Sequence, residues 1–321
     1  MADAVAVAVG RSRRSVRRGR TVTRTAVTTS GAPGLRDFAS LVKLSHSVFA
    51  LPFALLALLA ATGGRPGFPL LLLVLLAVVA ARTAAMAYNR LADRELDLDN
   101  PRTAGREIPA GVVSPRAALL LTLAAGAVFL AACWLLAPIC LLLGIPTLGW
   151  LLLYSHVKRF SALCHLWLGI ALGISPVAAW LAADGAFSAR LIAPVVLGSA
   201  VALWVAGFDI LYACQDREFD REHGLHSLPA RLGERAAMWA SRGLHAAALL
   251  GFAAFGLLVP LGPGFAVGLL LGAGLLVWQH RLLRPGDLSR IDTAFFTANG
   301  AIALVMFAAG CVDIYVFAPP A

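Results

Sequence analysis

The sequence contains few charged residues. Only 14% of its 321 residues are Asp, Glu, Lys or Arg, whereas a soluble domain typically contains about 25%. Apolar residues make up 60% of the chain, and most of them lie in long runs such as residues 68–81. Because a helix needs about 20 predominantly apolar residues to cross a bilayer, the composition excludes an ordinary soluble domain and predicts an all-α membrane protein.

Cysteine is also scarce, and its placement excludes two further kinds of structure. The five cysteines lie in or at the edge of apolar runs and form no CxxC pair; they are Cys133, Cys140, Cys164, Cys214 and Cys311. Without paired spacing they indicate neither a disulfide framework nor a zinc site. We expect them to be packing residues.

The apolar runs predict nine membrane-spanning helices. These cover residues 44–62, 68–89, 117–136, 138–156, 163–182, 191–214, 237–258, 264–280 and 292–311. We therefore expect residues 36–321 to form one polytopic membrane domain.

The N-terminal tail, residues 1–35, has a different composition. It combines several arginines with small and polar residues, which is typical of a disordered arm attracted to anionic lipid. No apolar segment directly follows the arginines, so a cleaved signal peptide is not expected. Nucleic-acid binding is the alternative interpretation of these arginines, but no folded nucleic-acid-binding motif is recognisable, and we expect no nucleic-acid partner.

Cations between the predicted spans are distributed unevenly. The connections after the second, fourth, sixth and eighth spans contain Arg90, Arg94, Arg102, Arg106, Arg116, Lys158, Arg159, Arg217, Arg221, Arg231, Arg235, Arg281, Arg284 and Arg290. The remaining connections contain only Arg65 and Arg190. Positive loops stay on the cytoplasmic side, so we expect a multi-pass protein of the inner (plasma) membrane with its N-terminus and its longest loops in the cytoplasm.

The first cluster of acids follows the second predicted span and reads NRLADRELD. Asn89, Asp93 and Asp97 have the spacing i, i+4, i+8, which places them on one face if the helix continues. Arg82 lies on the same face, seven residues before Asn89 and within the span. An arginine there should point into the bundle, because exposing it to lipid is costly.

The second cluster reads DILYACQDREFD and repeats this spacing. Tyr212, Asp216 and Asp220 are i, i+4, i+8, and Asp209 lies seven residues before Asp216. Asp209 could be a third acid of this site or could pair with Arg82.

Carboxylates at i, i+4 repel one another unless a cation neutralises them. Mg²⁺ prefers oxygen ligands and is usually held by one or two carboxylates together with substrate phosphate oxygens. The two clusters therefore predict a magnesium-dependent site that clamps a diphosphate. A solvated loop with surface ion pairs is the alternative for either cluster alone, and a secondary transporter with an intramembrane site of acids and arginine is the alternative for the whole protein.

These residues resemble the motifs of the UbiA family of membrane prenyltransferases. The family's N-x-x-x-D-x-x-x-D pattern matches Asn89, Asp93 and Asp97, and its D-x-x-x-D pattern matches Asp216 and Asp220. The resemblance extends to DNPRTAGREIPAG, YSHVKR, HSLPARLG and KLSHSVFALPFAL, and covers residues 36–311. It implies nine helices around a central cavity, with a cytoplasmic cap of loops. The residues of these motifs are most similar to those of the menaquinone enzymes of the futalosine route, and second most similar to those of the 4-hydroxybenzoate polyprenyltransferases.

The resemblance implies transfer of a polyprenyl group from its allylic diphosphate to an aromatic acid, of the 4-hydroxybenzoate or dihydroxynaphthoate type, in quinone biosynthesis. Asp93, Asp97, Asp216 and Asp220 would hold Mg²⁺ with Asn89, and Tyr212 would lie near the allylic cation. The expected substrate-binding residues are Arg82, Asn89, Arg102, Arg106, Tyr154, Lys158, Arg159 and Asp209. Another class of membrane enzymes, the CDP-alcohol phosphotransferases, is excluded because its D-G-x-x-A-R signature is absent.

Overall fold

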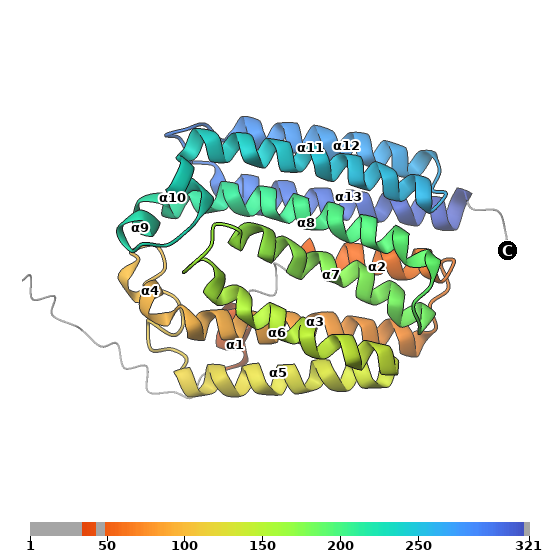
Figure 1. Ribbon diagram of the computed structural model, residues 1–321, viewed down its shortest axis with the longest axis horizontal. Helices are drawn as coiled ribbons and strands as arrows, with labels where there is room; N and C mark the ends of the chain where they lie inside the picture. Colours follow the sequence, from red (N-terminus) through yellow and green to blue (C-terminus); the bar gives the residue numbers. More distant parts are fainter. Residues whose placement is uncertain (1–33, 43–48, 318–321) are drawn as a thin grey trace, which may run out of the picture. The chain divides into compact units, whose positions relative to one another are not determined.

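The computed structural model describes residues 34–42 and 49–317 and contains helices, with no strand within those ranges (Figure 1). The expected N-terminal tail lies outside the described residues, apart from its last two positions. The beginning of the first predicted span, residues 44–48, also lies outside them. The predicted all-α membrane fold is confirmed.

Eight stretches of helix are long and apolar enough to cross a membrane, among the residues that the structure describes. They are built on α3 (Phe68–Ala92), α5 (Pro115–Leu136), α6 (Pro138–Val157), α7 (Cys164–Asp184), α8 (Ile192–Ala213), α11 (Glu234–Leu258), α12 (Pro263–Leu282) and α13 (Asn299–Val312). Two π-helical segments, η4 (Thr293–Ala298) and η5 (Asp313–Phe317), extend α13 at its two ends. The first predicted span is represented by α2 (Leu51–Ala61), which has 11 residues, so the described part of the chain supports eight long spans rather than nine.

Short helices gather at one end of the bundle, at the left in Figure 1. They are α4 (Arg94–Asp99), η3 (Cys214–Asp216), α9 (Arg217–Glu222) and α10 (Leu228–Leu232). A further short helix, α1 (Leu35–Val42), packs against α3, and η2 (Ala189–Leu191) precedes α8. The two acidic motifs therefore lie at the same end of the bundle.

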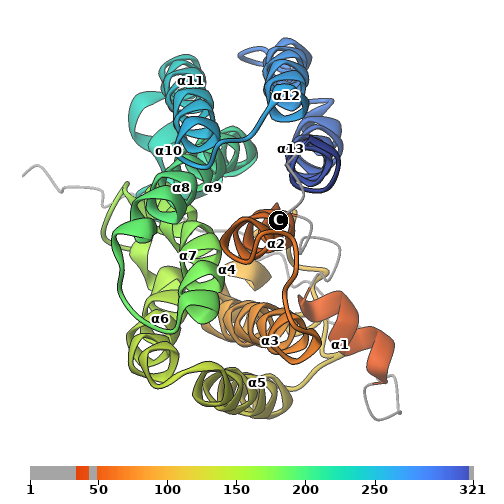
Figure 2. The same ribbon diagram turned by 90° about the vertical axis from the view of Figure 1, so that its right-hand side faces the viewer.

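The long helices follow one another around a ring, as the end-on view in Figure 2 shows. Each of the nine helices α2, α3, α5, α6, α7, α8, α11, α12 and α13 contacts the next one, and α13 returns to α2. Because α2 also contacts α7, the ring is divided into two parts. We call the part bounded by α2, α3, α5, α6 and α7 the first compartment, and the part bounded by α2, α7, α8, α11, α12 and α13 the second compartment.

Large aromatic side chains fill the second compartment. Phe53 stacks on Phe252 with ring centroids 5.4 Å apart and lies edge-on to Trp204 at 5.4 Å. Phe255 belongs to the same buried cluster. Since aromatic pairs contribute about 0.5–1.5 kcal/mol beyond their buried area, this half of the bundle is a packed core.

Helices α7 and α8 approach each other closely. A Cβ atom on Gly173 of α7 would collide with the carbonyl oxygen of Gly198 on α8, and a Cβ atom on Gly198 would collide with that of Gly173. A Cβ atom on Gly169 would collide with the carbonyl oxygen of Ala202. Small residues allow helix backbones to approach in this way, and they fix α7 against α8.

Candidate active site

Both acidic motifs interrupt the helices on which they begin. α3 ends at Ala92, and Asp93 separates it from α4. α8 ends at Ala213 and continues through the 3₁₀ turn η3 into α9, with Asp216 at the junction. The shared face of the first motif is predicted on the condition that the helix continues. Instead, the first acid of each motif, Asp93 or Asp216, sits at a break, although the backbone hydrogen bond from Asp97 N–H to Asp93 C=O persists.

A polar pocket of about 170 Å³ lies between these breaks. Of the predicted site residues, its walls contain Asn89, Asp93, Asp97, Arg102, Arg106, Tyr154, Lys158, Asp209, Tyr212, Asp216 and Asp220. Arg159 reaches the pocket through an ion pair with Asp93. Arg82 lines a different cavity, described below.

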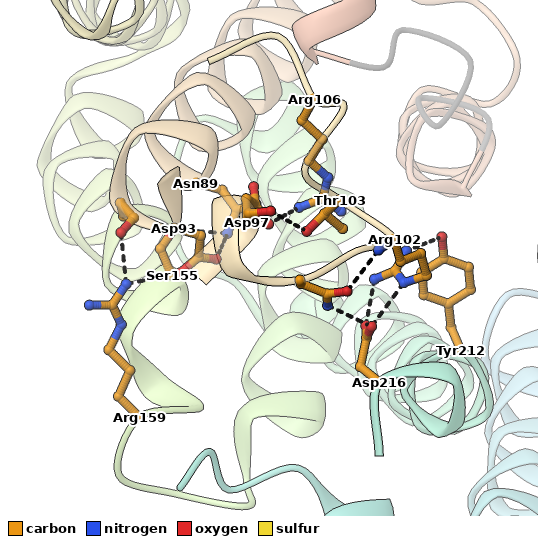
Figure 3. Close-up of polar contacts among 12 residues, drawn as sticks. Asn89, Asp93, Asp97, Arg102, Thr103, Arg106, Ser155, Arg159, Tyr212 and Asp216 are labelled. Carbon is orange, nitrogen blue, oxygen red and sulfur yellow. Dashed lines mark hydrogen bonds and ion pairs between the residues drawn. The ribbon is translucent and has the colours of Figure 1, made fainter. Parts of the chain in front are cut away.

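In the first motif, each aspartate contacts an arginine (Figure 3). The guanidinium of Arg159 lies 2.9 Å from Asp93 Oδ1, and Asn89 donates its amide N–H to Asp93 Oδ2 at 3.0 Å. Arg106 donates to Asp97 Oδ1 at 2.6 Å. Arginines from the loops therefore neutralise both acids of the first motif.

The loop that follows the first motif reaches the second motif. Arg102 donates two hydrogen bonds to the carboxylate of Asp216, one of them at 2.8 Å from Nε to Oδ1. Asn100 donates to the same oxygen at 3.0 Å, and the hydroxyl of Tyr212 accepts from Arg102 at 3.3 Å. Burial disfavours the charged guanidinium, but the hydrogen bonds and the charge of Asp216 outweigh this and raise the pKa of Arg102. Figure 3 shows how this arrangement joins the two motifs.

Tyr212 is also held from its other side. Its ring packs against Phe295, with centroids 4.2 Å apart. Phe295 belongs to the π-helical segment η4, whose Ala294 and Phe295 carbonyls accept hydrogen bonds from the side-chain amide of Asn299 at 3.3 and 2.9 Å. π-Helical turns are frequent at functional sites. This one places Phe295 against the ring of Tyr212, whose hydroxyl accepts a hydrogen bond from Arg102.

The donor set in the pocket suits a magnesium ion that arrives with a phosphate ligand. Among residues 34–42 and 49–317, no group of three His, Cys, Asp or Glu side chains is close enough to hold a metal by itself. However, Asp97 Oδ2 and Asp220 Oδ1 are buried oxygens that have no hydrogen-bond partner within those ranges. Mg²⁺ is commonly held by one or two carboxylates plus substrate oxygens, and each motif offers one such oxygen.

Two functional candidates were not predicted from the sequence. His165, at the start of α7, lies with its Nδ1 atom 2.7 Å from Asp209 Oδ2. Asp209, for which the sequence left open a place in the second acidic site or a pairing with Arg82, forms this contact with His165 in the structure. Asn100 was also missed, although it directly follows the first motif. Nothing in the sequence associates His165 with Asp209, because the two are 44 residues apart.

An apolar cavity of about 460 Å³ occupies the first compartment, between α3, α5, α6 and α7. Many of the side chains that line it are small: Ala77, Ala81, Ala85, Gly144, Ala171, Ala178, Ala179 and Ala182. Asn89 and Tyr154 line both this cavity and the polar pocket. Arg82 lines the apolar cavity, about 10 Å along α3 from Asn89 at 1.5 Å per residue.

The fold and the site define a polytopic helical membrane protein in which a charged pocket borders an apolar cavity. The sequence model of the UbiA prenyltransferase family matches residues 50–307. The chain therefore belongs to the UbiA prenyltransferase family, as its motifs predicted.

Relatives with assigned names agree with this membership. The chain is 34% identical over 252 residues to a 4-hydroxybenzoate octaprenyltransferase of Vibrio cholerae, a match that covers 76% of this chain and 84% of the relative. It is 32% identical over 261 residues to the enzyme of the same name from Aromatoleum aromaticum, covering 81% and 87%. The chain is thus an enzyme of the polyprenyltransferase class, and the transporter alternative is not supported.

Solved structures show the same fold. The apo structure of a UbiA homologue from Aeropyrum pernix has a TM-score of 0.76 at 38% identity, covering 84% of this chain and 98% of that one. A UbiA homologue from Archaeoglobus fulgidus, solved bound to GPP and Mg²⁺, has a TM-score of 0.66 at 21% identity, covering 87% and 100%.

Proposed function

We propose that this enzyme transfers a polyprenyl group from an allylic polyprenyl diphosphate to an aromatic acid of the 4-hydroxybenzoate type, with Mg²⁺, in quinone biosynthesis. The observation that carries the proposal is that Asn89 and Tyr154 line both the charged pocket and the apolar cavity. A substrate with a charged head and a long apolar tail fits this arrangement. The names of the relatives and the GPP and Mg²⁺ of the A. fulgidus homologue support it.

The polar pocket would bind the diphosphate. Each guanidinium that contacts a motif aspartate can also bind phosphate oxygens in bidentate fashion; these are Arg102, Arg106 and Arg159. Lys158 adds a further cation to the same wall. Bound Mg²⁺, held by Asp93, Asp97, Asp216 and Asp220 with Asn89, would supply positive charge that stabilises the departing diphosphate.

The apolar cavity would hold the prenyl chain and keep water from the allylic cation. Excluding water prevents quenching of the cation to a prenol. Tyr154, at the junction, and Tyr212, beside Arg102, would present rings or hydroxyls to the developing cation. Arg82 lies on the apolar side of the junction, where its guanidinium would bind the carboxylate of the aromatic acceptor.

The orientation in the membrane follows from the loop charges. The arginine-rich loops that form the polar pocket would lie in the cytoplasm, in a protein of the inner (plasma) membrane. The basic tail, residues 1–35, would contact anionic lipid. Diphosphate and acceptor would thus reach the pocket from the aqueous side, and the prenyl chain would remain within the membrane domain.

The direct test uses membranes that contain the protein, labelled polyprenyl diphosphates, and a panel of hydroxybenzoates and dihydroxynaphthoates. We expect a prenylated 4-hydroxybenzoate in the presence of Mg²⁺ and none after chelation, with activity restored when Mg²⁺ is added back. A product formed only from dihydroxynaphthoates would reassign the acceptor. Absence of any metal-dependent prenylated product would contradict the proposal.

A further inference from the structure

The acids of the polar pocket have different partners. Asp93, Asp97 and Asp216 each form an ion pair with an arginine. Asp209 and Asp220 form none with an arginine among the described residues, and the partner of Asp209 is the imidazole of His165. Asp209 therefore differs in its surroundings from the three arginine-paired acids.

Hydrogen bonds fix the tautomer of His165. The backbone N–H of Leu228 donates to His165 Nε2 at 3.1 Å, so this nitrogen must be the unprotonated acceptor. The proton of the ring then lies on Nδ1, which donates to Asp209 Oδ2 at 2.7 Å. His165 thus bonds one carboxylate oxygen of Asp209, Oδ2, through its Nδ1, and leaves Oδ1 available.

This pair joins two helices that pack closely against each other. His165 lies on α7 and Asp209 on α8, the helices whose backbones meet at Gly169, Gly173 and Gly198. His165 is 4% exposed. A carboxylate held in this way keeps one orientation in the pocket.

Asp209 lines the polar pocket together with Tyr154, which also borders the apolar cavity. It is seven residues before Asp216 on α8, which corresponds to about 10 Å along the helix. Arg82 precedes Asn89 on α3 by the same number of residues. Both positions are therefore set back along their helices from the motif acids; Arg82 lines the apolar cavity, whereas Asp209 lines the polar pocket with Tyr154.

We propose that Asp209, oriented by His165, is the base that removes the proton from the aromatic acceptor, an inference that rests on the proposed prenyl transfer. The allylic C–O bond breaks and its electron pair leaves with the diphosphate. A π electron pair of the ring forms the new C–C bond. The C–H bond at that ring carbon then breaks, its electrons restore the aromatic ring, and the proton passes to the available oxygen of Asp209. Protonating Asp93, Asp97 or Asp216 instead would remove an arginine ion pair, and Asp220 would be occupied as a ligand of Mg²⁺ in the proposed function.

Asp209→Asn separates loss of the base from loss of diphosphate binding. The substitution preserves the shape of the side chain, and the amide oxygen of the asparagine can still accept the hydrogen bond from His165 Nδ1. We expect kcat to fall by about 10²–10⁴-fold, the usual contribution of a general base, with the KM for both substrates unchanged. In the Asp209→Asn enzyme, removal of the ring proton should become the slow step. A primary isotope effect on kcat should therefore appear when the reacting ring position of the acceptor carries deuterium. Release of diphosphate with formation of prenol should continue, whereas Asp216→Asn should lose it.

His165 is a positioning residue, and a conservative substitution tests this. His165→Gln can donate to Asp209 and accept from Leu228, so it should recover most of the kcat that His165→Leu loses. Asp209→Glu keeps a carboxylate and should retain a higher kcat than Asp209→Asn. Activity in Asp209→Glu would show that substitution at this position does not prevent folding, so the lower kcat of Asp209→Asn reflects loss of the base. Asp184→Asn is the matched control, because Asp184 pairs with Arg190 outside the pocket; its kcat should not change.

Two results would overturn the inference. One is an Asp209→Asn enzyme with the wild-type kcat and no isotope effect. The other is an effect on KM alone, which would make Asp209 a binding residue. If the wild-type enzyme itself yields no prenylated aromatic product, the proposed function fails instead, so the two failures are distinguishable.

Discussion

The two compartments of the bundle have similar walls and different contents. The second compartment is filled by Trp204, Phe53, Phe252 and Phe255. The first contains a cavity of about 460 Å³, and alanine or glycine occupies nine of the 31 positions that line it. Because both are rings of apolar helices that share α2 and α7, the difference lies in side-chain volume. Small residues in one half leave room for a substrate chain, and large residues in the other provide the packed core.

Two carboxylates at opposite ends of the bundle also differ in their surroundings. Asp216 lines the polar pocket and contacts Arg102 and Asn100. Asp313 is buried at the other end of the bundle, where it accepts hydrogen bonds from the backbone N–H groups of Gly264 at 2.9 Å and Phe265 at 2.6 Å. The first carboxylate is placed for chemistry, and the second caps the N-terminus of α12.

The largest effect should come from exchanging these two carboxylates for amides. Asp216→Asn removes a charge from the pocket, and we expect prenyl transfer to fall by at least about 10²–10³-fold, as for loss of one electrostatic contact to a transition state. Asp313→Asn should leave turnover per folded molecule unchanged but lower the free energy of unfolding by about 1–3 kcal/mol. Initial rates and thermal unfolding of both purified variants provide the measurement. Equal losses of turnover would remove the distinction between the two acids.

Deleting a ring from the second compartment should affect stability and spare activity. Phe252→Ala leaves a cavity beside Phe53 and Trp204, and we expect a loss of about 3–5 kcal/mol in the free energy of unfolding. Unfolding monitored in detergent micelles measures this loss, and kcat is measured below the unfolding transition. A large change in chain-length preference would show that this compartment also contacts the substrate.

Adding a ring should have opposite consequences in the two compartments. Ala178→Phe projects into the apolar cavity, which has room for the ring, so the fold should persist while transfer from long polyprenyl diphosphates falls more than transfer from short ones. Ala248 is fully buried in the second compartment, and Ala248→Phe should cost about 1–3 kcal/mol through overpacking. Competition between diphosphates of different chain length measures the first effect. An unchanged preference in Ala178→Phe would place the prenyl chain elsewhere.

The smallest effect should follow from Tyr212→Phe. The ring remains packed against Phe295, and only the hydroxyl that accepts from Arg102 is lost. A single hydrogen bond of this kind contributes about 0.5–1.5 kcal/mol, which corresponds to a reduction in kcat/KM of about tenfold or less. Tyr212→Leu, which also removes the ring, should cost more. Equal effects in the two variants would show that the ring has no role beyond its hydroxyl.

Much of this architecture follows from local sequence patterns. Apolar runs predict the long helices to within a few residues. The bilayer thickness sets the length of a span, and a helix is the structure in which such a run pairs all of its own backbone N–H and C=O groups. The spacing of Asn89, Asp93 and Asp97, repeated at Tyr212, Asp216 and Asp220, predicts two acidic helix ends. The structure places both ends around one pocket.

Contacts between distant segments could not be predicted in this way. Arg102 pairs with Asp216 across 114 residues, and His165 meets Asp209 only because α7 and α8 approach closely at their glycines. The breaks at Asp93 and Asp216 were also missed, since helical spacing alone does not show where a helix is interrupted. Similarly, the division into a filled and a hollow compartment depends on which helices face one another, which the sequence pattern does not specify.

The most direct test of this account is a structure of the enzyme with Mg²⁺ and a non-cleavable polyprenyl diphosphate analogue. We expect the diphosphate beside Asp93, Asp97, Asp216 and Asp220, and density for the chain passing Asn89 and Tyr154 into the cavity between α3, α5, α6 and α7. Density for the chain between α8, α11 and α12, or a diphosphate bound away from both motifs, would contradict the account.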